Sequence, residues 1–164
     1  MPNSLDAFEA ITRALARLPK REPAVQPAAE SPLLHPFDVR NIHPDLPPKV
    51  KELFDDGYYV QATFLACTYL DNVVQKHSAI KESGYKLMMQ AFDDSNPKVK
   101  LTPLVTISEI DEQKGFRFIF AGGVQAIRNP RGHDAKIVDD IDTCLDHLAF
   151  VSLLLRRLEQ AGYK

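Results

Sequence analysis

Residues 137–162, IVDDIDTCLDHLAFVSLLLRRLEQAG, form the most regular stretch of the sequence. Apolar side chains recur in it at steps of three and four, the spacing that places them on one face of an amphipathic α-helix. The stripe runs through Ile137, Ile141, Cys144, Leu145, Leu148, Ser152, Leu155 and Leu158. Asp134 can cap the N-terminus of this helix, and Ala161-Gly162 is expected to end it. The stretch therefore predicts a long helix that buries one face.

Similar stripes occur upstream. They predict helices from Pro48 to about Gly57, from Val60 to about His77, over 85–92, and over 116–127. The Thr106-x-x-Glu109 pattern is typical of a capping box before the last of these. Residues 98–107 alternate weakly between polar and apolar side chains, so they could form either a loop or a short strand. Gly122-Gly123 would allow another helix to approach closely. With no convincing strand pair, the pattern predicts an all-α helical bundle over residues 37–164.

Two further segments precede this domain. Residues 1–18 carry an apolar stripe that predicts an amphipathic helix. Such a short helix is marginal alone, so it is expected to pack on the domain or to bind an antitoxin or another protein partner. Residues 19–36 contain five prolines and few large apolar side chains, which indicates an extended Pro-rich linker.

Composition excludes several classes of protein. Hydrophobic residues make up 45% of the chain, too many for a disordered protein, and no apolar run is long enough to span a membrane. The N-terminus lacks the apolar stretch of a signal peptide, so a cytoplasmic location is expected. Cys67 and Cys144 lie inside apolar stripes and are expected to be reduced core residues. No cofactor and no metal site is predicted.

Charge is distributed unevenly along the chain. The net charge of −2 argues against a general nucleic-acid coat protein. Residues 114–136 nevertheless hold five basic side chains and one acid, which makes this stretch +4 and the remainder −6. A local basic region in an acidic chain suits an enzyme that grips one phosphate group.

The basic stretch contains the candidate catalytic motif, residues 128–133, Arg-Asn-Pro-Arg-Gly-His. In a straight helix Arg128 and His133 would point about 140° apart. Pro130 and Gly132 predict a break between them, which could bring both side chains together. A histidine can take the proton of a ribose 2′-hydroxyl or protonate the leaving 5′-oxygen, and a guanidinium can stabilise charge on the phosphate.

The motif and three other stretches together resemble the HEPN superfamily of ribonucleases, and more narrowly its bacterial Ymh/Abi-like group. The other stretches are LFDDGYY at 53–59, GYKLMMQAF at 84–92 and FAGG at 120–123, so the resemblance spans about residues 43–160. It implies an antiparallel helical bundle that dimerises with both motifs facing each other. It also implies metal-independent cleavage of RNA, often in toxin–antitoxin or phage-defence systems.

Carried onto this chain, the resemblance makes Arg128 and His133 catalytic and Asn129 supporting. The group usually has alanine where this chain has Gly132, so a looser motif is expected. Some HEPN toxins have a tyrosine two positions after the histidine that a nucleotidyltransferase antitoxin modifies. Ala135 stands there, which speaks against this form of control.

A chemical argument also favours a homodimer. Cleavage by proton transfer needs a base and an acid, whereas the motif offers one histidine per chain, and a two-fold axis would supply both. The alternative from a different class is a non-catalytic helical module that binds RNA, a nucleotide or a protein partner.

Other residues admit two interpretations each. Arg131 is expected to be an exposed charge and could add a phosphate contact to the RNA substrate. His147 and His43 are expected to be structural, and Asp71 could reach the groove. Tyr58 and Tyr59 are expected to pack in the core rather than to stack on bases.

Overall fold

The computed structural model describes residues 34–164. The predicted helix over residues 1–18 and all but the last three residues of the linker lie outside the described part of the chain. Within that part, all regular secondary structure is helical, which confirms the predicted all-α class. The elements are α2 (Pro36–Val39), α3 (Pro48–Asp55), α4 (Tyr59–Ser78), α5 (Gly84–Ala91), α6 (Ile107–Gly123), the π-helix η1 (Val124–Arg128), α7 (Asn129–His133) and α8 (Ile141–Gln160).

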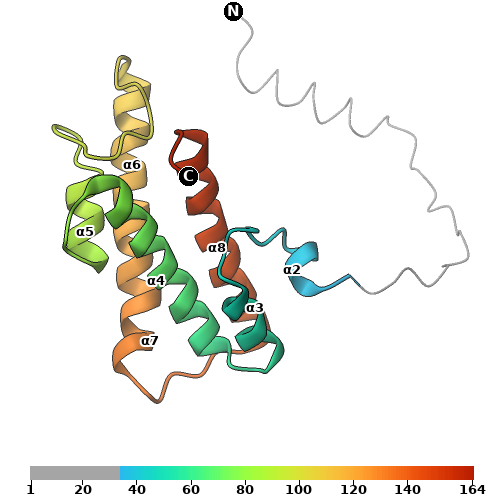
Figure 1. Ribbon diagram of the computed structural model, residues 1–164. Helices are drawn as coiled ribbons and strands as arrows, with labels where there is room; N and C mark the ends of the chain where they lie inside the picture. The colour runs from blue at the N-terminus through green and yellow to red at the C-terminus, as the bar shows by residue number, and fades with distance from the viewer. Residues whose placement is uncertain (1–33) are drawn as a thin grey trace, which may run out of the picture. The chain divides into compact units, whose positions relative to one another are not determined.

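Three long helical rods form the bundle (Figure 1). Thr63 near the start of α4 contacts Cys144 near the start of α8, and His77 near the end of α4 contacts Tyr163 just beyond α8, so these helices run parallel. The third rod, α6 with η1 and α7, runs in the opposite direction beside both of them, and α5 packs against it. The bundle therefore combines one parallel helix pair with an antiparallel partner.

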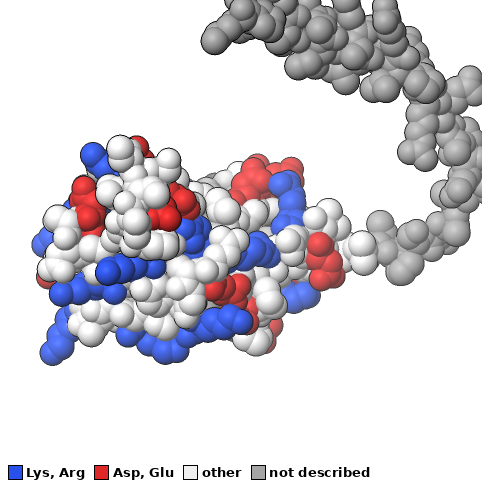
Figure 2. All heavy atoms as spheres, turned by 90° about the horizontal axis from the view of Figure 1, so that it is seen from above, with Lys and Arg blue, Asp and Glu red and all other residues white. Residues whose placement is uncertain are grey.

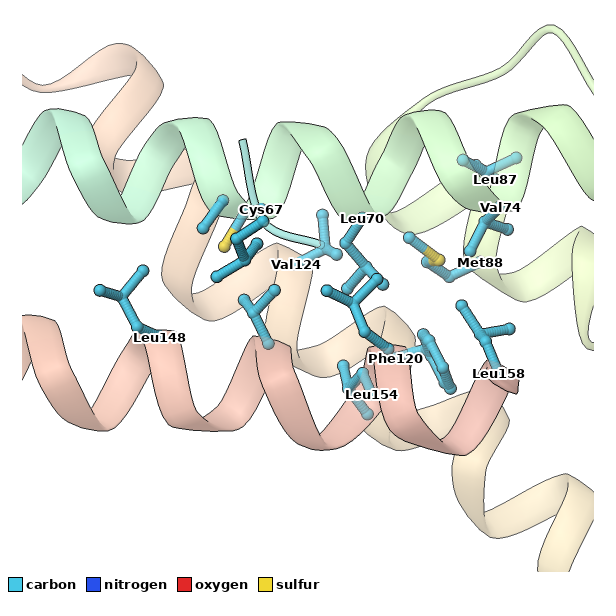
Figure 3. Packing of buried hydrophobic residues seen from close by; sticks show 14 of the residues in the cluster. Cys67, Leu70, Val74, Leu87, Met88, Phe120, Val124, Leu148, Leu154 and Leu158 are labelled. Carbon is cyan, nitrogen blue, oxygen red and sulfur yellow. The ribbon is translucent and has the colours of Figure 1, made fainter. Parts of the chain in front are cut away.

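The apolar stripes of α4 and α8 face each other and build the core, as Figure 3 shows for Leu70 and Val74 opposite Leu154 and Leu158. Phe120 from α6 closes this layer and stacks on Phe92, with ring centroids 4.3 Å apart. Burying each side chain of this kind stabilises a fold by about 1.5–3 kcal/mol. Cys67 and Cys144 are buried free thiols, as predicted.

The ends of the helices follow local side-chain chemistry in most places. Thr106 and Glu109 form the predicted capping box at the start of α6. Gly57, at φ +81°, ends α3 in a backbone conformation that favours glycine. The predicted cap of the last helix was wrong. Asp140, not Asp134, caps α8 by accepting a hydrogen bond from the backbone N–H of Thr143 at 2.7 Å.

Residues 98–106 form a loop, which decides between the two alternatives left open by the sequence. Gln113 on α6 is fully buried and holds this loop in place. Its side-chain oxygen accepts from the backbone N–H of Leu101 at 2.8 Å, and its amide donates to the carbonyl of Val99 at 3.0 Å. These bonds satisfy backbone groups that would otherwise be buried unpaired.

The two adjacent glycines of α6 have different surroundings. A Cβ atom on Gly123 would lie 2.3 Å from Cε1 of Phe150, whereas one on Gly122 would have no atom within 4 Å. Gly123 therefore allows α6 and α8 to approach closely, as predicted for this pair. None of the helices within residues 34–164 is long and apolar enough to cross a membrane.

Candidate functional site

The motif lies on an uninterrupted helical segment, which corrects the predicted break between Arg128 and His133. The helix continues from α6 through one π-helical turn, in which the backbone N–H of Asn129 bonds to the carbonyl of Val124. Pro130 then stands in the first turn of α7. Proline cannot donate the next helical hydrogen bond and its ring crowds the preceding turn, so the helix widens there instead of breaking.

Arg128 points inward from this π-helical turn toward α4. Its guanidinium carbon lies 5.5 Å from the centroid of the Phe64 ring, a cation–π distance. On another side, a Cβ atom on Gly84 would lie 3.6 Å from Nη1 of Arg128. The hydrogen bond from Nη1 to the side-chain oxygen of Asn129 is long, at 3.4 Å, and the buried Nε has no hydrogen-bond partner in the described chain. The guanidinium is therefore held in place while its donors stay largely uncommitted.

His133 ends α7 and is exposed to solvent. Within residues 34–164 no hydrogen bond or ion pair joins His133 to Arg128. The Arg128 guanidinium contacts Asn129 and the Phe64 ring instead. Because α7 stays helical, the two side chains leave the helix about 140° apart. A single chain therefore does not bring the two predicted catalytic groups to one point in the way that a break would have done.

Arg131 is committed to a buried ion pair, so the prediction that it is an exposed charge was wrong. Its side chain is 9% exposed, and it binds both carboxylate oxygens of Asp139, with Nε donating to Oδ2 at 2.6 Å. Its Nη1 also donates to the backbone carbonyl of Ile127 at 2.8 Å. Planar bidentate pairing of this kind fixes geometry as well as charge. Arg131 therefore anchors α7 to the loop before α8, and with its donors occupied by Asp139 and Ile127 it is not available as a phosphate contact.

His147 of α8 lies beside this ion pair. Its Nδ1 is 4.0 Å from Oδ2 of Asp139 and has no hydrogen-bond partner among the described residues. Burial, and secondly the positive charge of Arg131, lower the pKa of His147 below its ordinary value. The imidazole is therefore held neutral next to the anchor of α7, in keeping with the predicted structural role.

Two of the five basic side chains of residues 114–136 are neutralised by acids from other parts of the described chain. Arg117 pairs with Asp93 at 2.9 Å and with Asp94 at 2.7 Å, and Arg131 pairs with Asp139. Figure 2 views the bundle from the end opposite to α7, and basic and acidic side chains are interspersed on that end. Among the three arginines of this stretch, Arg128 is the one that forms no ion pair with a described residue.

Gly132 has a packing role, contrary to the expectation that it loosens the motif. A Cβ atom on Gly132 would lie 2.8 Å from Cε2 of Phe64. Real side chains do not approach this closely, so α7 rests directly on the Phe64 ring that also lies under Arg128. Phe64 therefore links the position of α7 to the position of the Arg128 guanidinium.

One group in the described chain has metal-ligand chemistry, namely His43, Asp45 and Glu159. His43 is 4% exposed, and its Nδ1 accepts a hydrogen bond from the backbone N–H of Asp45 at 3.2 Å. In the neutral imidazole, the proton then lies on Nε2, which faces Glu159 at 3.1 Å. A metal would need the Nε2 lone pair, so this arrangement fits a His–Glu hydrogen bond better than a metal centre. His43 is thus structural.

The fold and site define an all-helical domain with an Arg-Asn pair in a π-helical turn and a histidine at the solvent-exposed end of the same rod. The chain belongs to the Hypoth_Ymh family, described as "Protein of unknown function (Hypoth_ymh)", whose profile matches residues 40–158. This confirms the Ymh part of the resemblance. No curated protein and no solved structure matched the chain.

Three residues around the motif were not among the candidate site residues of the sequence. Phe64 belongs to the apolar stripe of α4, Gly84 begins α5, and Asp139 is one of several acids before α8. Each contacts the motif only because distant segments meet in the fold. Asp71 lies on α4 and is 2% exposed, so its side chain does not face an open groove.

Proposed function

We propose that the protein is a HEPN-type endoribonuclease that cleaves RNA without a metal, acts as a homodimer and serves as a toxin or phage-defence effector. The observation that carries this proposal is the state of Arg128. Its guanidinium is braced by the Phe64 ring, yet its donors are not consumed by an acid, unlike those of Arg117 and Arg131. An arginine held in this way suits recognition of a phosphate.

The chemistry follows from the residue types. His133, exposed at the end of α7, is placed to exchange protons with RNA from solvent. As a base it removes the proton of the 2′-hydroxyl, whose oxygen then attacks the adjacent phosphorus and expels the 5′-oxygen. The Arg128 guanidinium stabilises the charge that builds on the phosphate oxygens, and Asn129 orients the phosphate or the guanidinium. The expelled oxygen takes a proton, and the products carry a 2′,3′-cyclic phosphate and a 5′-hydroxyl.

A homodimer supplies what one chain lacks. Within one chain Arg128 faces α4 while His133 faces solvent, so a facing copy can complete the site with a second histidine as the acid. Phe118 and Ile119, on the rod that leads to the motif, are 53% and 42% exposed. Large apolar side chains that stay open to solvent favour burial against a partner, here a second copy.

The first experiment measures cleavage of single-stranded and hairpin RNA by the purified protein in EDTA. We expect cleavage with cyclic-phosphate ends, and a loss of about 100-fold or more in His133→Ala and Arg128→Ala, the range typical of a lost proton-transfer group. Lys136→Ala, which removes an exposed charge close to the motif, is the matched control and should cleave at the wild-type rate. Equal rates in His133→Ala and wild type would contradict the catalytic role.

The dimer is tested by co-expressing wild-type and His133→Ala chains. If both histidines of a dimer take part, mixed dimers are inactive and the activity per wild-type chain falls as the variant is added in excess. A wild-type chain that stays monomeric at micromolar concentration and still cuts RNA would contradict the shared site. In a bacterial host, toxicity of the wild type that His133→Ala relieves without loss of folding supports the effector role.

A second candidate is a non-catalytic helical module that binds RNA, a nucleotide or a protein partner. The separation of His133 from Arg128 within one chain favours it, since binding does not require the two groups to meet. RNA that is bound by the dimer, released intact after prolonged incubation, and bound more weakly by Arg128→Ala would support this candidate over the enzyme.

A further inference from the structure

Asp71 is a buried acid whose environment is incompletely paired. It lies on α4 and is 2% exposed. Its Oδ2 accepts a hydrogen bond from the backbone N–H of Gly84 at 2.9 Å, whereas its Oδ1 is buried and has no hydrogen-bond partner in the described chain. An uncompensated buried carboxylate strongly destabilises a fold, so a nearby positive charge is required if it is to stay ionised.

Arg128 supplies that charge. The same Gly84 whose N–H binds Asp71 would place a Cβ atom 3.6 Å from Nη1 of Arg128, so both side chains lie near this residue without forming a direct ion pair. The buried Nε of Arg128 also has no hydrogen-bond partner in residues 34–164, so each of the two side chains keeps one unpaired buried polar atom. Burial raises the pKa of Asp71, and the Gly84 hydrogen bond and the charge of Arg128 lower it.

Gly84 suits this position through its backbone conformation. Its φ of +63° lies in the left-handed region, where a side chain is strained. The guanidinium thus lies near both the Phe64 ring and Gly84, and the Asp71 carboxylate binds the backbone N–H of the same glycine. Arg131, the other arginine near this part of α4, is already paired with Asp139.

We propose that Asp71 is a positioning residue of the site: the charge of its buried carboxylate, close to Arg128 but not bonded to it, orients the guanidinium so that its Nη groups face the scissile phosphate of RNA. This inference rests on the proposed ribonuclease function. Asp71 is too deeply buried to touch RNA, so it acts only through Arg128. The same charge also keeps Arg128 from turning toward bulk solvent when no substrate is bound.

A purely structural role for Asp71 makes a different prediction. Gly84 is the first residue of α5, and the preceding Ser83 makes no side-chain capping bond, so Asp71 could serve only to satisfy an N–H at the start of that helix. An amide oxygen can do the same. Asp71→Asn keeps the acceptor for Gly84 and removes the charge. This variant therefore separates positioning from capping.

The experiment compares Asp71→Asn with Asp140→Asn under single-turnover cleavage of RNA. Asp140→Asn is the matched control, because it replaces another capping carboxylate by a capping amide at the start of α8. We expect kcat to fall at least tenfold in Asp71→Asn with a smaller change in KM, and neither to change in Asp140→Asn. We also expect Asp71→Asn to have little further effect when Arg128→Ala has already removed the guanidinium.

Nuclear magnetic resonance tests the inference independently of activity. The Nε–H signal of Arg128 should shift in Asp71→Asn, while that of Arg131, bonded to Asp139, serves as an internal reference and stays in place. If the Arg128 signal is unchanged, or if kcat is that of the wild type, the positioning role is overturned. A shifted signal in a protein that cleaves no RNA would support the positioning role while refuting the proposed function.

If Asp71→Asn does not fold, Arg128→Gln provides the test, since it leaves Asp71 in place. The charge of Arg128 lowers the pKa of Asp71, so this pKa, followed by the carboxyl carbon resonance, should rise in Arg128→Gln. It should not change in Lys136→Gln, which removes an exposed charge in the loop between α7 and α8. An unchanged pKa in Arg128→Gln would overturn the coupling between the two groups.

Discussion

Replacing each of two adjacent glycines by alanine should change stability in opposite directions. Gly122 and Gly123 both lie in the last turn of α6, so a methyl group improves the helix propensity of each by about 1 kcal/mol. Their surroundings differ. The new Cβ at 122 meets no atom within 4 Å, whereas that at 123 lies 2.3 Å from Cε1 and 2.7 Å from Cζ of Phe150.

The size of the difference follows from this overlap. Carbon atoms pack best about 3.5–4.0 Å apart, so the Phe150 ring or the whole of α8 must move by about 1 Å to accept the methyl group. Overpacking of this kind costs about 1–3 kcal/mol. Gly122→Ala should therefore stabilise the protein by up to about 1 kcal/mol, and Gly123→Ala should be less stable than Gly122→Ala by about 1–3 kcal/mol.

Urea unfolding followed by circular dichroism measures this difference. With a slope of about 2 kcal/mol per molar urea, the two midpoints should differ by about 0.5–1.5 M. Gly115→Ala, at another position of α6 with no atom within 4 Å, should behave like Gly122→Ala. Phe150→Leu should reduce the penalty of Gly123→Ala, because it removes the two ring atoms that collide. Equal midpoints for Gly122→Ala and Gly123→Ala would refute the close approach of α6 and α8.

Three further predictions concern the side chains of Arg131, His147 and Cys67. Arg131→Met should lower the free energy of unfolding by about 3–5 kcal/mol, as expected when one partner of a buried ion pair is lost, and a loss under 1 kcal/mol in a urea titration would contradict that pairing. Burial lowers the pKa of His147 below its ordinary value of 6.5. As the pH falls, His147 therefore takes up a proton in the unfolded chain before it does so in the folded chain. Stability should therefore fall as the pH drops from 7.5 toward 5.5, and His147→Gln should flatten that part of the profile; identical profiles would exclude the effect. Burial raises the pKa of Cys67 to about 12, so a thiol reagent at pH 8 should modify Cys67 only after denaturation, and rapid labelling of the native protein would show that the site opens.

The long helices could be predicted from the sequence because their signal is local. The apolar spacing of Leu70 and Val74 in α4, or of Leu148 and Leu155 in α8, is present in any conformation of the chain and favours burial on one face. The capping box at Thr106 is equally local, since both of its partners lie within one turn. These features need no knowledge of which helices become neighbours.

Predictions failed where two local rules competed or where the outcome depended on packing. Asp134, Asp139 and Asp140 can all cap a helix, and the choice fell on Asp140 because Arg131 binds Asp139 and ties down the intervening loop. Pro130 indicated a break, but the buried Val124 and the inward-facing Arg128 hold the segment against α4, and a π-helical turn absorbs the distortion instead.

The sequence by itself determined the all-helical class, the positions of the long helices and the presence of an Arg-Asn and His motif near the end of one of them. Only the tertiary structure decided which arginine of that motif has guanidinium N–H donors that no acid occupies. Arg128 and Arg131 are three residues apart and chemically identical, but Asp139 takes up the donors of Arg131, whereas Arg128 lies on Phe64 and forms no ion pair with a described residue. The physical reason is that charge pairing depends on spatial neighbours, and these come from segments far apart along the chain.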